Sequence, residues 1–493
     1  MIKSATNRLF DRAMDFAAIL QQAPPAGARL PLQRQLLQRF KNAILDGRLA
    51  PGSRLPASRA LAQQLGISRN TVLLAYEHLA AEGYVRADRQ GTRVAGLARA
   101  GMPARASAAS SAGPTARRLA ALKASAPRTD TYLPLRPGTP ALNHFPASAW
   151  RNALERALRE APAALLGYGE PAGEPRLRQA IAAYLAAARG VRCEARQIVI
   201  TEGAQEGLAL CVRLLGNAGD TAWVEDPGYR GAKTALRCGD MRVVPVRVDA
   251  AGLLAPPQAW RDAPPRLIYV TPSHQYPTGG VLPVTRRLAL IEQARRAGAW
   301  IIEDDYDSEF RHQGEPIAAM QGLVPDAPVL YVGTYSKTMF PSLRLGFVVL
   351  PTGLADEAAE ALAEMLRGGH RHEQWALASF IESGQFTRHL NRMRRLYRER
   401  QQALRAALAR HLRVPHEVLG GHCGLHLTLR LPAALDDRAI AAQALRLGMA
   451  PQALSGFAIA PRPEDTGLVL GYGNTSAELF EPLIERLARL IQA

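Results

Sequence analysis

Short apolar runs alternate with amphipathic segments through most of the chain after residue 131. Seven runs have the length and composition of buried strands, and most are followed by residues with helical spacing. They cover residues 198–201, 221–224, 242–246, 267–270, 300–303, 329–332 and 346–350. This alternation predicts an α/β domain with a large, mainly parallel sheet over residues 131–352. The later pattern is mostly helical, with strands near 425–429 and 468–471, so we expect a smaller C-terminal α+β domain over 353–493.

A different pattern occupies residues 30–96, where helical spacing recurs three times within a short distance. Helices are predicted over 32–45, 58–65 and 69–83, followed by a hairpin of two short strands over 84–95. Ser68 is a suitable N-cap for the third helix, because its hydroxyl can accept a hydrogen bond from an exposed backbone amide. Two helices joined by a short glycine-containing turn and followed by a hairpin predict a winged helix-turn-helix.

Two segments lack this regularity. Residues 1–29 contain one candidate helix ended by two prolines, and we interpret them as an N-terminal packing arm. Residues 97–130 are rich in Ala, Ser, Pro, Gly and Arg with little periodicity, which predicts a linker. A small N-terminal domain is therefore expected to be tethered to a much larger one.

The net charge of the chain indicates which classes of partner it binds. The net charge is +18 at pH 7 and the pI is about 10.3, which favours a nucleic acid or another polyanion, although part of the excess reflects an arginine-rich composition. The four cysteines are widely separated, as is typical of free thiols in a reducing compartment. No apolar run reaches about 18 residues, so we predict no membrane span and expect a cytoplasmic protein.

The candidate chemistry centres on residues 331–347, which read YVGTYSKTMFPSLRLGF and put Lys337 in a tight connection between two apolar strands. A lysine in apolar surroundings loses hydration, so its pKa falls and its neutral amine becomes a nucleophile. Thr334, Ser336 and Arg344 are donors of the kind that bind a phosphate. The chain has only five lysines, so a lysine here indicates a need for a titratable amine. Together these residues predict a Schiff-base site for pyridoxal 5′-phosphate (PLP).

The segment SKTMFPSLRLGF resembles the lysine-bearing segment of fold-type I aminotransferases, with lysine, proline, arginine and glycine at the expected spacing. The resemblance implies that Asp304 bonds the nitrogen of the cofactor ring and that Tyr306 bonds its 3-oxygen. A carboxylate at the ring nitrogen keeps the ring protonated and able to withdraw electrons. Asp305 and Asp307, beside them, are expected to be solvated or capping groups.

Two further loops follow predicted strands and complete the expected cofactor site. Gly203, Ala204 and Gln205 precede a helix predicted to start at Glu206, where backbone amides would bind the phosphate. Tyr229 lies on a sharp turn, which suits a ring that stacks on the cofactor.

Two expectations depend on the resemblance to aminotransferases. Many of these enzymes have an asparagine before Pro-Thr-Gly, where this chain has Tyr276, and His274 or Gln275 is expected to compensate. Tyr168, in the segment YGEPAG, is expected to reach the phosphate of a neighbouring subunit, which implies an obligate homodimer with shared sites.

Residues 47–85, GRLAPGSRLPASRALAQQLGISRNTVLLAYEHLAAEGYV, resemble the winged helix-turn-helix of the GntR family. The resemblance implies that the third helix lies in the major groove with its N-terminal residues facing bases. Arginines of the turn and the wing would neutralise phosphates. The expected DNA-binding residues are Arg54, Ser58, Arg59, Ser68, Arg69, Asn70, Thr71, Arg89 and Arg93.

One cluster contains the residue types of a metal site: His416, His422, Cys423 and His426. Its spacing does not match a zinc site, and the leucines around it alternate as in a strand. We therefore predict no metal.

A GntR-like winged helix followed by a complete aminotransferase-like domain resembles the MocR subfamily of bacterial regulators, over nearly the whole chain after residue 28. The resemblance implies a PLP-dependent transcription regulator that binds a double-stranded DNA operator as a head-to-tail homodimer. A small amino compound would be its effector and would exchange with Lys337 to form an external aldimine.

Two alternatives remain open. The first is a working aminotransferase that carries a DNA-binding domain. Aminotransferases commonly bind the substrate carboxylate with an arginine just before a motif like residues 470–474, where this chain has Val469, with Arg462 in the preceding loop as a substitute. This departure favours sensing over efficient turnover, or a ligand unlike a simple α-amino acid. The second is a PLP-independent repressor, which is hard to reconcile with intact Lys337, Asp304 and Arg344.

Overall fold

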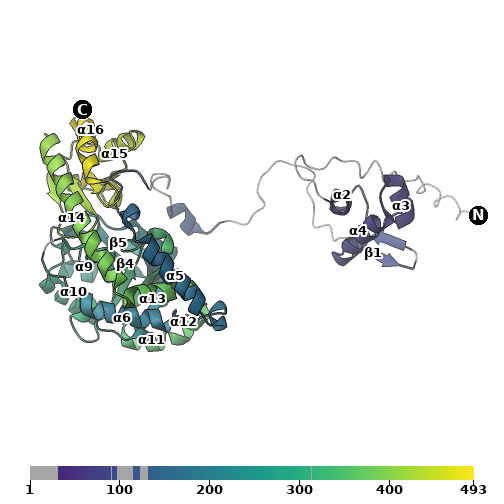
Figure 1. Cartoon of the computed structure of the whole chain (residues 1–493), viewed down its shortest axis with the longest axis horizontal. Coiled ribbons are helices and arrows are strands. Elements are labelled where there is room, and N and C mark those ends of the chain that lie inside the picture. Colours follow the sequence, from purple (N-terminus) through teal and green to yellow (C-terminus); the bar gives the residue numbers. More distant parts are fainter. Residues whose placement is uncertain (1–30, 90, 97–114, 123–131, 313, 493) are drawn as a thin grey trace, which may run out of the picture. The chain divides into compact units, whose positions relative to one another are not determined.

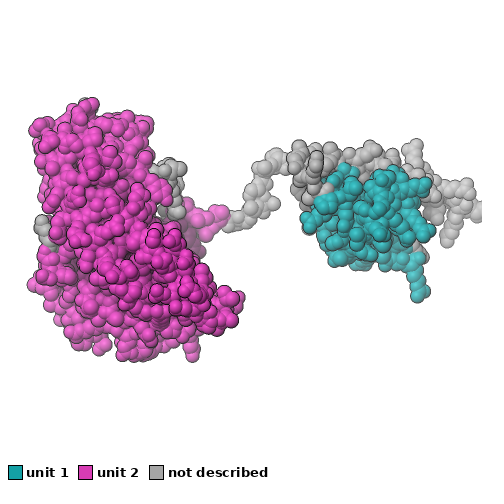
Figure 2. Space-filling view, viewed as in Figure 1, with its two compact units in different colours: residues 1–113 teal, residues 114–493 magenta. Residues whose placement is uncertain are grey.

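The computed structural model of the protein describes residues 31–89, 91–96, 115–122, 132–312 and 314–492. The chain divides into two compact units, Met1–Gly113 and Pro114–Ala493, which are coloured separately in Figure 2. The predicted N-terminal arm and most of the predicted linker lie outside the described residues.

The first unit consists of three helices and a hairpin. They are α2 (Leu32–Leu45), α3 (Ser58–Leu65), α4 (Arg69–Ala81), β1 (Val85–Asp88) and β2 (Gly91–Val94), with β1 antiparallel to β2. Leu36, Phe40, Val72 and Leu79 are buried together, because apolar residues of α2 and α4 recur at the helical period and face each other. The predicted winged helix-turn-helix is confirmed.

The ends of α4 follow from local chemistry. Ser68 Oγ accepts a hydrogen bond from the Thr71 amide at 3.1 Å and so caps the helix. The helix ends at Ala81, two residues earlier than predicted, and the chain turns at Gly83, whose φ of 78° suits a residue without a side chain.

The second unit is built on an eight-stranded sheet in the order β3-β10-β9-β8-β7-β4-β5-β6. The strands are β3 (Ile198–Thr201), β4 (Thr221–Asp226), β5 (Arg242–Asp249), β6 (Gly252–Leu253), β7 (Leu267–Val270), β8 (Trp300–Asp305), β9 (Val329–Thr334) and β10 (Gly346–Val349). The mainly parallel sheet is confirmed, because β5, β4, β7, β8 and β9 run parallel. β10 is antiparallel to both neighbours, because the connection over residues 335–345 is too short for a parallel crossover.

Helices flank this sheet. They are α5 (Ala147–Glu160), α6 (Pro175–Arg189), α7 (Ala204–Leu215), α8 (Arg230–Cys238), α9 (Pro257–Asp262), α10 (Val284–Ala297), α11 (Thr352–Glu357), α12 (Ala359–Met365) and α13 (Arg371–Glu382). In Figure 1, α5, α6 and α13 lie together, and α13 packs against both of the others. The helix after residue 370 therefore lies beside helices that precede the sheet in sequence. None of the helices in the described ranges combines the length and the apolarity needed to cross a bilayer.

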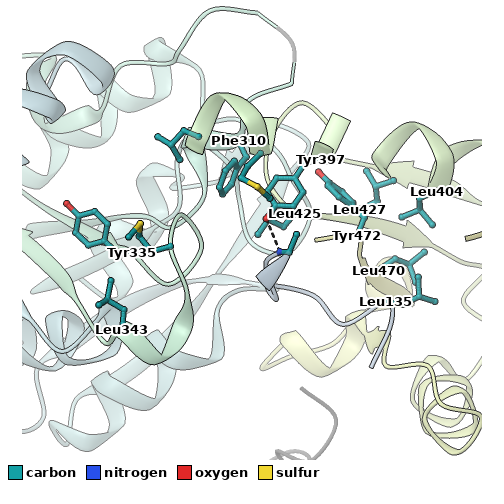
Figure 3. Packing of buried hydrophobic residues seen from close by; sticks show 14 of the residues in the cluster. Leu135, Phe310, Tyr335, Leu343, Tyr397, Leu404, Leu425, Leu427, Leu470 and Tyr472 are labelled. Carbon is teal, nitrogen blue, oxygen red and sulfur yellow. Dashed lines mark hydrogen bonds between the residues drawn. The ribbon is translucent and has the colours of Figure 1, made fainter. Parts of the chain in front are cut away.

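The last part of the chain adds a four-stranded antiparallel sheet in the order β11-β12-β14-β13. Its elements are α14 (Gln385–His411), β11 (Glu417–Leu419), β12 (His426–Arg430), α15 (Asp437–Arg446), β13 (Gln452–Ala453), β14 (Gly467–Gly471) and α16 (Phe480–Gln492). Leu427 and Leu470 of this sheet share one core with Leu404 and Tyr397 of α14, and the Tyr397 ring meets Phe310 edge to face at 4.9 Å (Figure 3). This hydrophobic core extends from the C-terminal sheet to the large sheet, because the same cluster also contains Tyr335 and Leu343, which follow β9.

Part of the predicted linker contacts the second unit. Residues Arg117–Ala121 form a short 3-10 helix near α8. Arg118 Nη1 donates to Asp240 Oδ2 at 2.7 Å and to Cys238 O at 2.9 Å, at the end of α8.

A buried ion pair holds the end of β8 against α6. Arg189 Nε donates to Asp305 Oδ2 at 2.7 Å, and Tyr331 Oη donates to the same oxygen at 2.5 Å. Both charged side chains are less than 5% exposed, at 4% and 3%. Although burial opposes ionisation of Asp305, the Arg189 charge and these hydrogen bonds lower the pKa of its carboxyl. Asp305 was expected to be a solvated or capping group, and this prediction is wrong, because Asp305 is buried against Arg189. Arg189 lies far from Asp305 in sequence, so the local sequence pattern did not reveal the pair.

Arg189→Met should lower the free energy of unfolding of the second unit by about 3–5 kcal/mol at pH 7, because it leaves the Asp305 charge buried without its cation. The folded-state pKa of Asp305 is lowered, so the pair stabilises the wild type above the unfolded pKa and loses this effect as the pH falls. The difference between variant and wild type should therefore shrink at acid pH. Urea unfolding at pH 7 and at pH 3, below the ordinary pKa of 3.8 for an aspartate, measures it.

Arg296→Met is the matched control, because Arg296 pairs with Glu292 on the surface of α10. Its unfolding midpoint should stay near that of the wild type. Equal effects of the two substitutions would contradict a role for the buried pair.

Candidate functional site

A cavity of about 430 Å³ lies where the carboxyl ends of β4, β8 and β9 meet the C-terminal sheet. Parallel strands bring their ends to one edge, which is where open α/β sheets bind ligands. It is lined by Arg136, Pro137, Gly138, Ala204, Gln205, Tyr229, Arg230, Tyr269, Tyr276, Asp304, Tyr306, Asp307, Thr334, Ser336, Lys337, Pro341, Arg344, Leu425, His426, Gln452 and Phe457. Nine of the residues predicted for a cofactor site are brought together here: Ala204, Gln205, Tyr229, Asp304, Tyr306, Thr334, Ser336, Lys337 and Arg344.

Lys337 lies just after β9, and its Nζ donates to Gly138 O at 2.5 Å. A Cβ on Gly138 would lie 3.1 Å from this nitrogen, and the φ of Gly138 is 76°, so a glycine allows the close approach. Burial lowers the pKa of the Lys337 amine, while the carboxylates of Asp307 and Asp304 act in the opposite direction. The amine is therefore easier to deprotonate than a surface lysine.

Asp304, the next-to-last residue of β8, is 3% exposed. Its Oδ2 accepts a hydrogen bond from Tyr269 Oη at 2.7 Å, whereas its buried Oδ1 has no partner among the described residues. Burial raises the pKa of this carboxyl to about 7, although the Tyr269 hydrogen bond and Lys337 oppose the shift. A buried acceptor that lacks a donor fits a ligand that supplies one.

Tyr306 is backed by a histidine and a carboxylate. Its Oη lies 2.9 Å from His274 Nδ1, and the same nitrogen lies 3.0 Å from Asp307 Oδ1. Burial raises the pKa of Asp307, and the neighbouring His274 opposes this. Asp307 is 1% exposed, so its predicted solvated or capping role is wrong. His274 itself does not line the cavity, but it contacts Tyr306, Asp307 and His426, which do.

The start of α7 and Arg344 both line the cavity. The helix begins at Ala204 rather than at Glu206, so Ala204 and Gln205 belong to its first turn. Gly203 precedes it with a φ of 80°, and a Cβ there would lie 3.1 Å from Arg344 Nη1. Backbone amides at a helix start and a guanidinium are suited to bind a phosphate. Ser336 adds a hydroxyl, which accepts a hydrogen bond from Thr334 Oγ1 at 3.1 Å.

Besides His274, three predicted residues do not line the cavity. Gln275 is buried: its Nε2 donates to Pro227 O, in the turn after β4, at 3.0 Å, and its Oε1 accepts from Thr278 Oγ1 at 2.6 Å. Gly203 does not line the cavity, but it lies against the Arg344 side chain, which does. Tyr168 is 90% exposed, so its expected role in a neighbouring subunit stays a prediction.

Several residues of the cavity were not predicted from the sequence. Tyr269 sits in a buried strand, and nothing in the run LIYV distinguishes a ligand-facing tyrosine from a core residue. Arg136 and Arg230 come from a loop before α5 and from the start of α8. The only signal for Arg230 is its position directly after Tyr229 on the same turn.

The four residues with metal-ligating side chains that the sequence analysis considered do not form one cluster in the structure. His416 is exposed, and Cys423 Sγ lies 3.5 Å from Asp307 O. His426 instead groups with His274 and Asp307, with donor atoms within 4.8 Å of one another. His426 Nε2 already lies 2.9 Å from Pro277 O, and His274 Nδ1 is bonded to Asp307. Burial lowers the pKa of His426 to about 3, so this ring is neutral.

The first unit offers a separate candidate site at the start of α4. Ser68, Arg69 and Asn70 are exposed there. Arg69 Nε donates to Ser58 Oγ at 3.4 Å and links the starts of α3 and α4. The hydroxyls of Ser68 and Thr71 lie 2.8 Å apart and bond each other. Arg69 and Asn70 are therefore the best placed of the predicted base-reading residues.

Arginines surround this helix start. Arg54, Arg59 and Arg89 are exposed, while Arg93 is half-buried and donates to Gly52 O at 3.2 Å. In the described part of this unit the ion pairs join Lys41 to Glu82 and Arg48 to Asp46, so the predicted DNA-binding arginines have no carboxylate partner there. Their charge is available to an external polyanion.

Comparisons with known proteins agree with both units. Residues 32–94 match bacterial regulatory proteins of the gntR family, and residues 133–450 match aminotransferase class I and II. The chain is 39% identical over 469 residues to the probable rhizopine catabolism regulatory protein MocR of Rhizobium meliloti, covering 93% of this chain and 94% of that protein. It is 34% identical over 448 residues to the pyridoxine biosynthesis transcriptional regulator PdxR of Corynebacterium glutamicum, covering 89% and 91%.

The second unit is also similar to a solved structure. The α-aminoadipate aminotransferase LysN of Thermus thermophilus, complexed with N-(5′-phosphopyridoxyl)-L-leucine, superposes with a TM-score of 0.67 and 27% identity. The match covers 73% of this chain and 92% of that one. The chain therefore belongs to the MocR family of GntR-type transcription regulators, in which a helix-turn-helix domain precedes a domain with the aminotransferase class I and II fold.

Proposed function

We propose that the protein is a cytoplasmic, PLP-dependent regulator that binds a DNA operator through its first unit and senses a small amino compound through its second. One observation carries the proposal. Lys337, the start of α7 and the carboxylate of Asp304, whose Oδ1 lacks a partner among the described residues, border the same cavity.

The residues of the cavity fit PLP. Asp304 Oδ1 is a buried acceptor that the ring N–H would satisfy, and Tyr306 would donate to the ring oxygen. Tyr229 borders the same space and would cover one face of the ring. The start of α7, Ser336 and Arg344 would bind the phosphate. When bound, PLP supplies an aldehyde carbon at which one amine can replace another.

Sensing then depends on Lys337. An incoming amine would release the Lys337 Nζ, whose lowered pKa favours a neutral amine, and would add its own contacts to the cavity. A ligand can shift a protein only by binding one arrangement better than another. We propose that these contacts favour one arrangement of the DNA-binding units in a head-to-tail homodimer, with Tyr168 reaching the partner's site.

A working aminotransferase is the second candidate, favoured by the complete set of Lys337, Asp304 and Tyr306 in one cavity. Against it stands Val469, which is buried on β14 at the position where the resemblance implies a carboxylate-binding arginine. Arg462 does not line the cavity. Regulation is therefore the better-supported proposal.

Lys337→Ala should abolish the visible absorbance band of the protein purified with PLP, because no other amine borders the cavity among the described residues. Borohydride reduction of the wild type followed by peptide mass spectrometry should locate the cofactor on Lys337. Lys233→Arg is the matched control: Lys233 is also buried, but it pairs with Asp226 Oδ1 at 3.2 Å, and arginine keeps that charge. A cofactor found on Lys233 would refute the assignment.

Arg69→Ala should weaken binding to an operator selected from random DNA by at least about 1 kcal/mol, while binding to unselected DNA changes little, if Arg69 reads a base. Arg89→Ala should instead weaken both alike and reduce the salt dependence of binding, because a wing arginine would contact phosphate. Fluorescence anisotropy at several salt concentrations separates the two. An equal loss for Arg69→Ala on both DNAs would show that it contacts phosphate only.

An amine that changes the visible spectrum of the wild type should change its operator affinity by roughly 5–150-fold, and the operator should change amine affinity by the same factor. Lys337→Ala should fold and bind the operator but lose this response. Operator titrations with and without the amine, on both proteins, measure it. A response of the variant equal to that of the wild type would mean that sensing does not pass through Lys337.

A further inference from the structure

One nitrogen of His274 lies between the phenol of Tyr306 and a buried carboxylate. His274 Nδ1 is 2.9 Å from Tyr306 Oη and 3.0 Å from Asp307 Oδ1. His274 and Asp307 are only 2% and 1% exposed, so bulk water does not compete for these contacts. A Cβ on Gly424 would lie 2.7 Å from His274 Nδ1, so the loop before β12 packs closely on this nitrogen. The three polar groups are therefore held in place by packing.

The carboxylate of Asp307 determines which nitrogen of His274 carries the hydrogen. A neutral imidazole has one N–H and one bare nitrogen, and an ionised carboxylate can only accept hydrogen bonds. Burial raises the pKa of Asp307 and His274 opposes this rise, so their pairing favours the ionised carboxylate. A bare Nδ1 would face this carboxylate acceptor against acceptor and would take the hydroxyl hydrogen of Tyr306. With the hydrogen on Nδ1, His274 donates to Asp307, and Tyr306 keeps its hydrogen for another acceptor.

The second nitrogen of the His274 ring supports the same assignment. His274 Nε2 is buried and has no partner among the described residues. The His426 ring lies 5.0 Å from it between centroids, but His426 Nε2 donates to Pro277 O, and a pKa of about 3 leaves the other nitrogen of His426 without a hydrogen. Among buried backbone groups, an N–H without an acceptor is rarer than an acceptor without a donor. The same preference leaves Nε2 of His274 bare and places the hydrogen on Nδ1.

Gln275 was the other residue expected to compensate for the asparagine that Tyr276 replaces. Its amide bonds Pro227 O and Thr278 Oγ1, in the loops around it. Of the two candidates, His274 is the one that hydrogen-bonds Tyr306 in the described part of the chain. Compensation by this segment therefore passes through Tyr306.

The phenol of Tyr306 is protonated at neutral pH. Burial raises its pKa well above the usual range of a tyrosine. The titratable groups that face it act in the same direction, and they are Asp307, Tyr276, Cys423 and Asp304. Tyr306 therefore has one hydrogen to donate.

Resting on the proposed function, we propose that His274, oriented by Asp307, positions Tyr306 so that its hydroxyl donates to the oxygen of the cofactor ring. His274 does not line the cavity and acts through the phenol, so it is a positioning residue. Because hydrogen bonds in a chain polarise one another, a phenol whose oxygen accepts from His274 is a stronger donor toward the cavity. Asp307, His274 and Tyr306 thus form one hydrogen-bonded chain that ends at the ligand.

The test is a pH titration of the visible absorbance of the full-length protein loaded with PLP. A donor at the ring oxygen stabilises the negative charge there, so the proton shared with the Lys337 nitrogen is lost at lower pH. Tyr306→Phe removes the donor and should raise the pH midpoint by about one pH unit or more. His274→Phe should raise it by roughly half a pH unit or more, because the hydroxyl of Tyr306 is no longer oriented.

A double variant separates positioning from a direct electrostatic effect. In the Tyr306→Phe background, His274→Phe should leave the midpoint within about 0.3 pH unit, because the hydroxyl through which His274 acts is absent. His274→Asn should restore most of the wild-type midpoint, since its amide nitrogen can take the place of Nδ1 and donate to the same oxygens. The amide of His274→Gln reaches the place of Nε2 instead, so this variant should titrate like His274→Phe and is used in its place if that protein does not fold.

His312→Phe is the matched control. His312 is also buried, but its Nε2 lies 3.1 Å from Gly424 O and 2.9 Å from Tyr472 Oη, and it does not line the cavity. This variant should titrate like the wild type.

The outcomes separate the role of His274 from the proposed function. If His274→Phe and His274→Gln keep the wild-type midpoint, or if His274→Phe raises it equally with and without the Tyr306 hydroxyl, the positioning role is overturned and PLP binding on Lys337 stands. If the wild type forms no visible band with PLP, the proposed function fails, and the role of His274 fails with it.

Discussion

A buried carboxylate and a desolvated amine share one cavity, and each opposes the neutralisation of the other. Burial raises the pKa of Asp304 and lowers that of Lys337, while the charge of each shifts the other back. Such a pair is costly in a protein interior unless its remaining hydrogen-bonding atoms find partners. Tyr269 and Gly138 provide some of them, and Asp304 Oδ1 is left for a ligand. The cavity is therefore built to be completed by a polar group from outside.

The fold keeps these groups together through the geometry of its sheet. β8 and β9 run parallel and adjacent, so the residues that follow them emerge at the same edge. The Arg189–Asp305 pair fixes the end of β8 from the side of α6, one residue beyond Asp304. The C-terminal sheet closes the cavity from the other side with His426 and Gln452. Large and small sheets thus contribute to one site although their strands are far apart in sequence.

Charge is distributed differently over the two units. In the first, arginines without carboxylate partners in its described part surround the exposed start of α4, as a DNA-binding surface requires. In the second, arginines at the cavity are placed individually: Arg344 beside the start of α7, and Arg230 against Phe457. The high net charge of the chain alone does not distinguish these uses. Only the position of each guanidinium relative to a helix start, an aromatic ring or a cavity does so.

The sequence by itself determined the architecture and the local part of the site. Each apolar run that predicted a strand of the large sheet coincides with one, and central strands such as β7 and β9 are continuously apolar because the sheet buries both of their faces. Lys337, Asp304, Tyr306 and Tyr229 were identified because each lies at or within three residues of the end of such a strand in a recognisable motif, and all four line the cavity. Local order along the chain was sufficient for these.

Only the tertiary structure decided which other residues join them. Asp305 and Asp307 are as polar as any surface residue, and their burial depends on Arg189 and His274, which lie far away in sequence. In the sequence, Tyr269 resembles a core tyrosine and Arg230 a surface arginine. Both line the cavity, because the fold brings the ends of their segments together. Periodicity and motifs report the environment of a residue along its own segment, whereas membership of a cavity depends on contacts between segments, which no local pattern encodes.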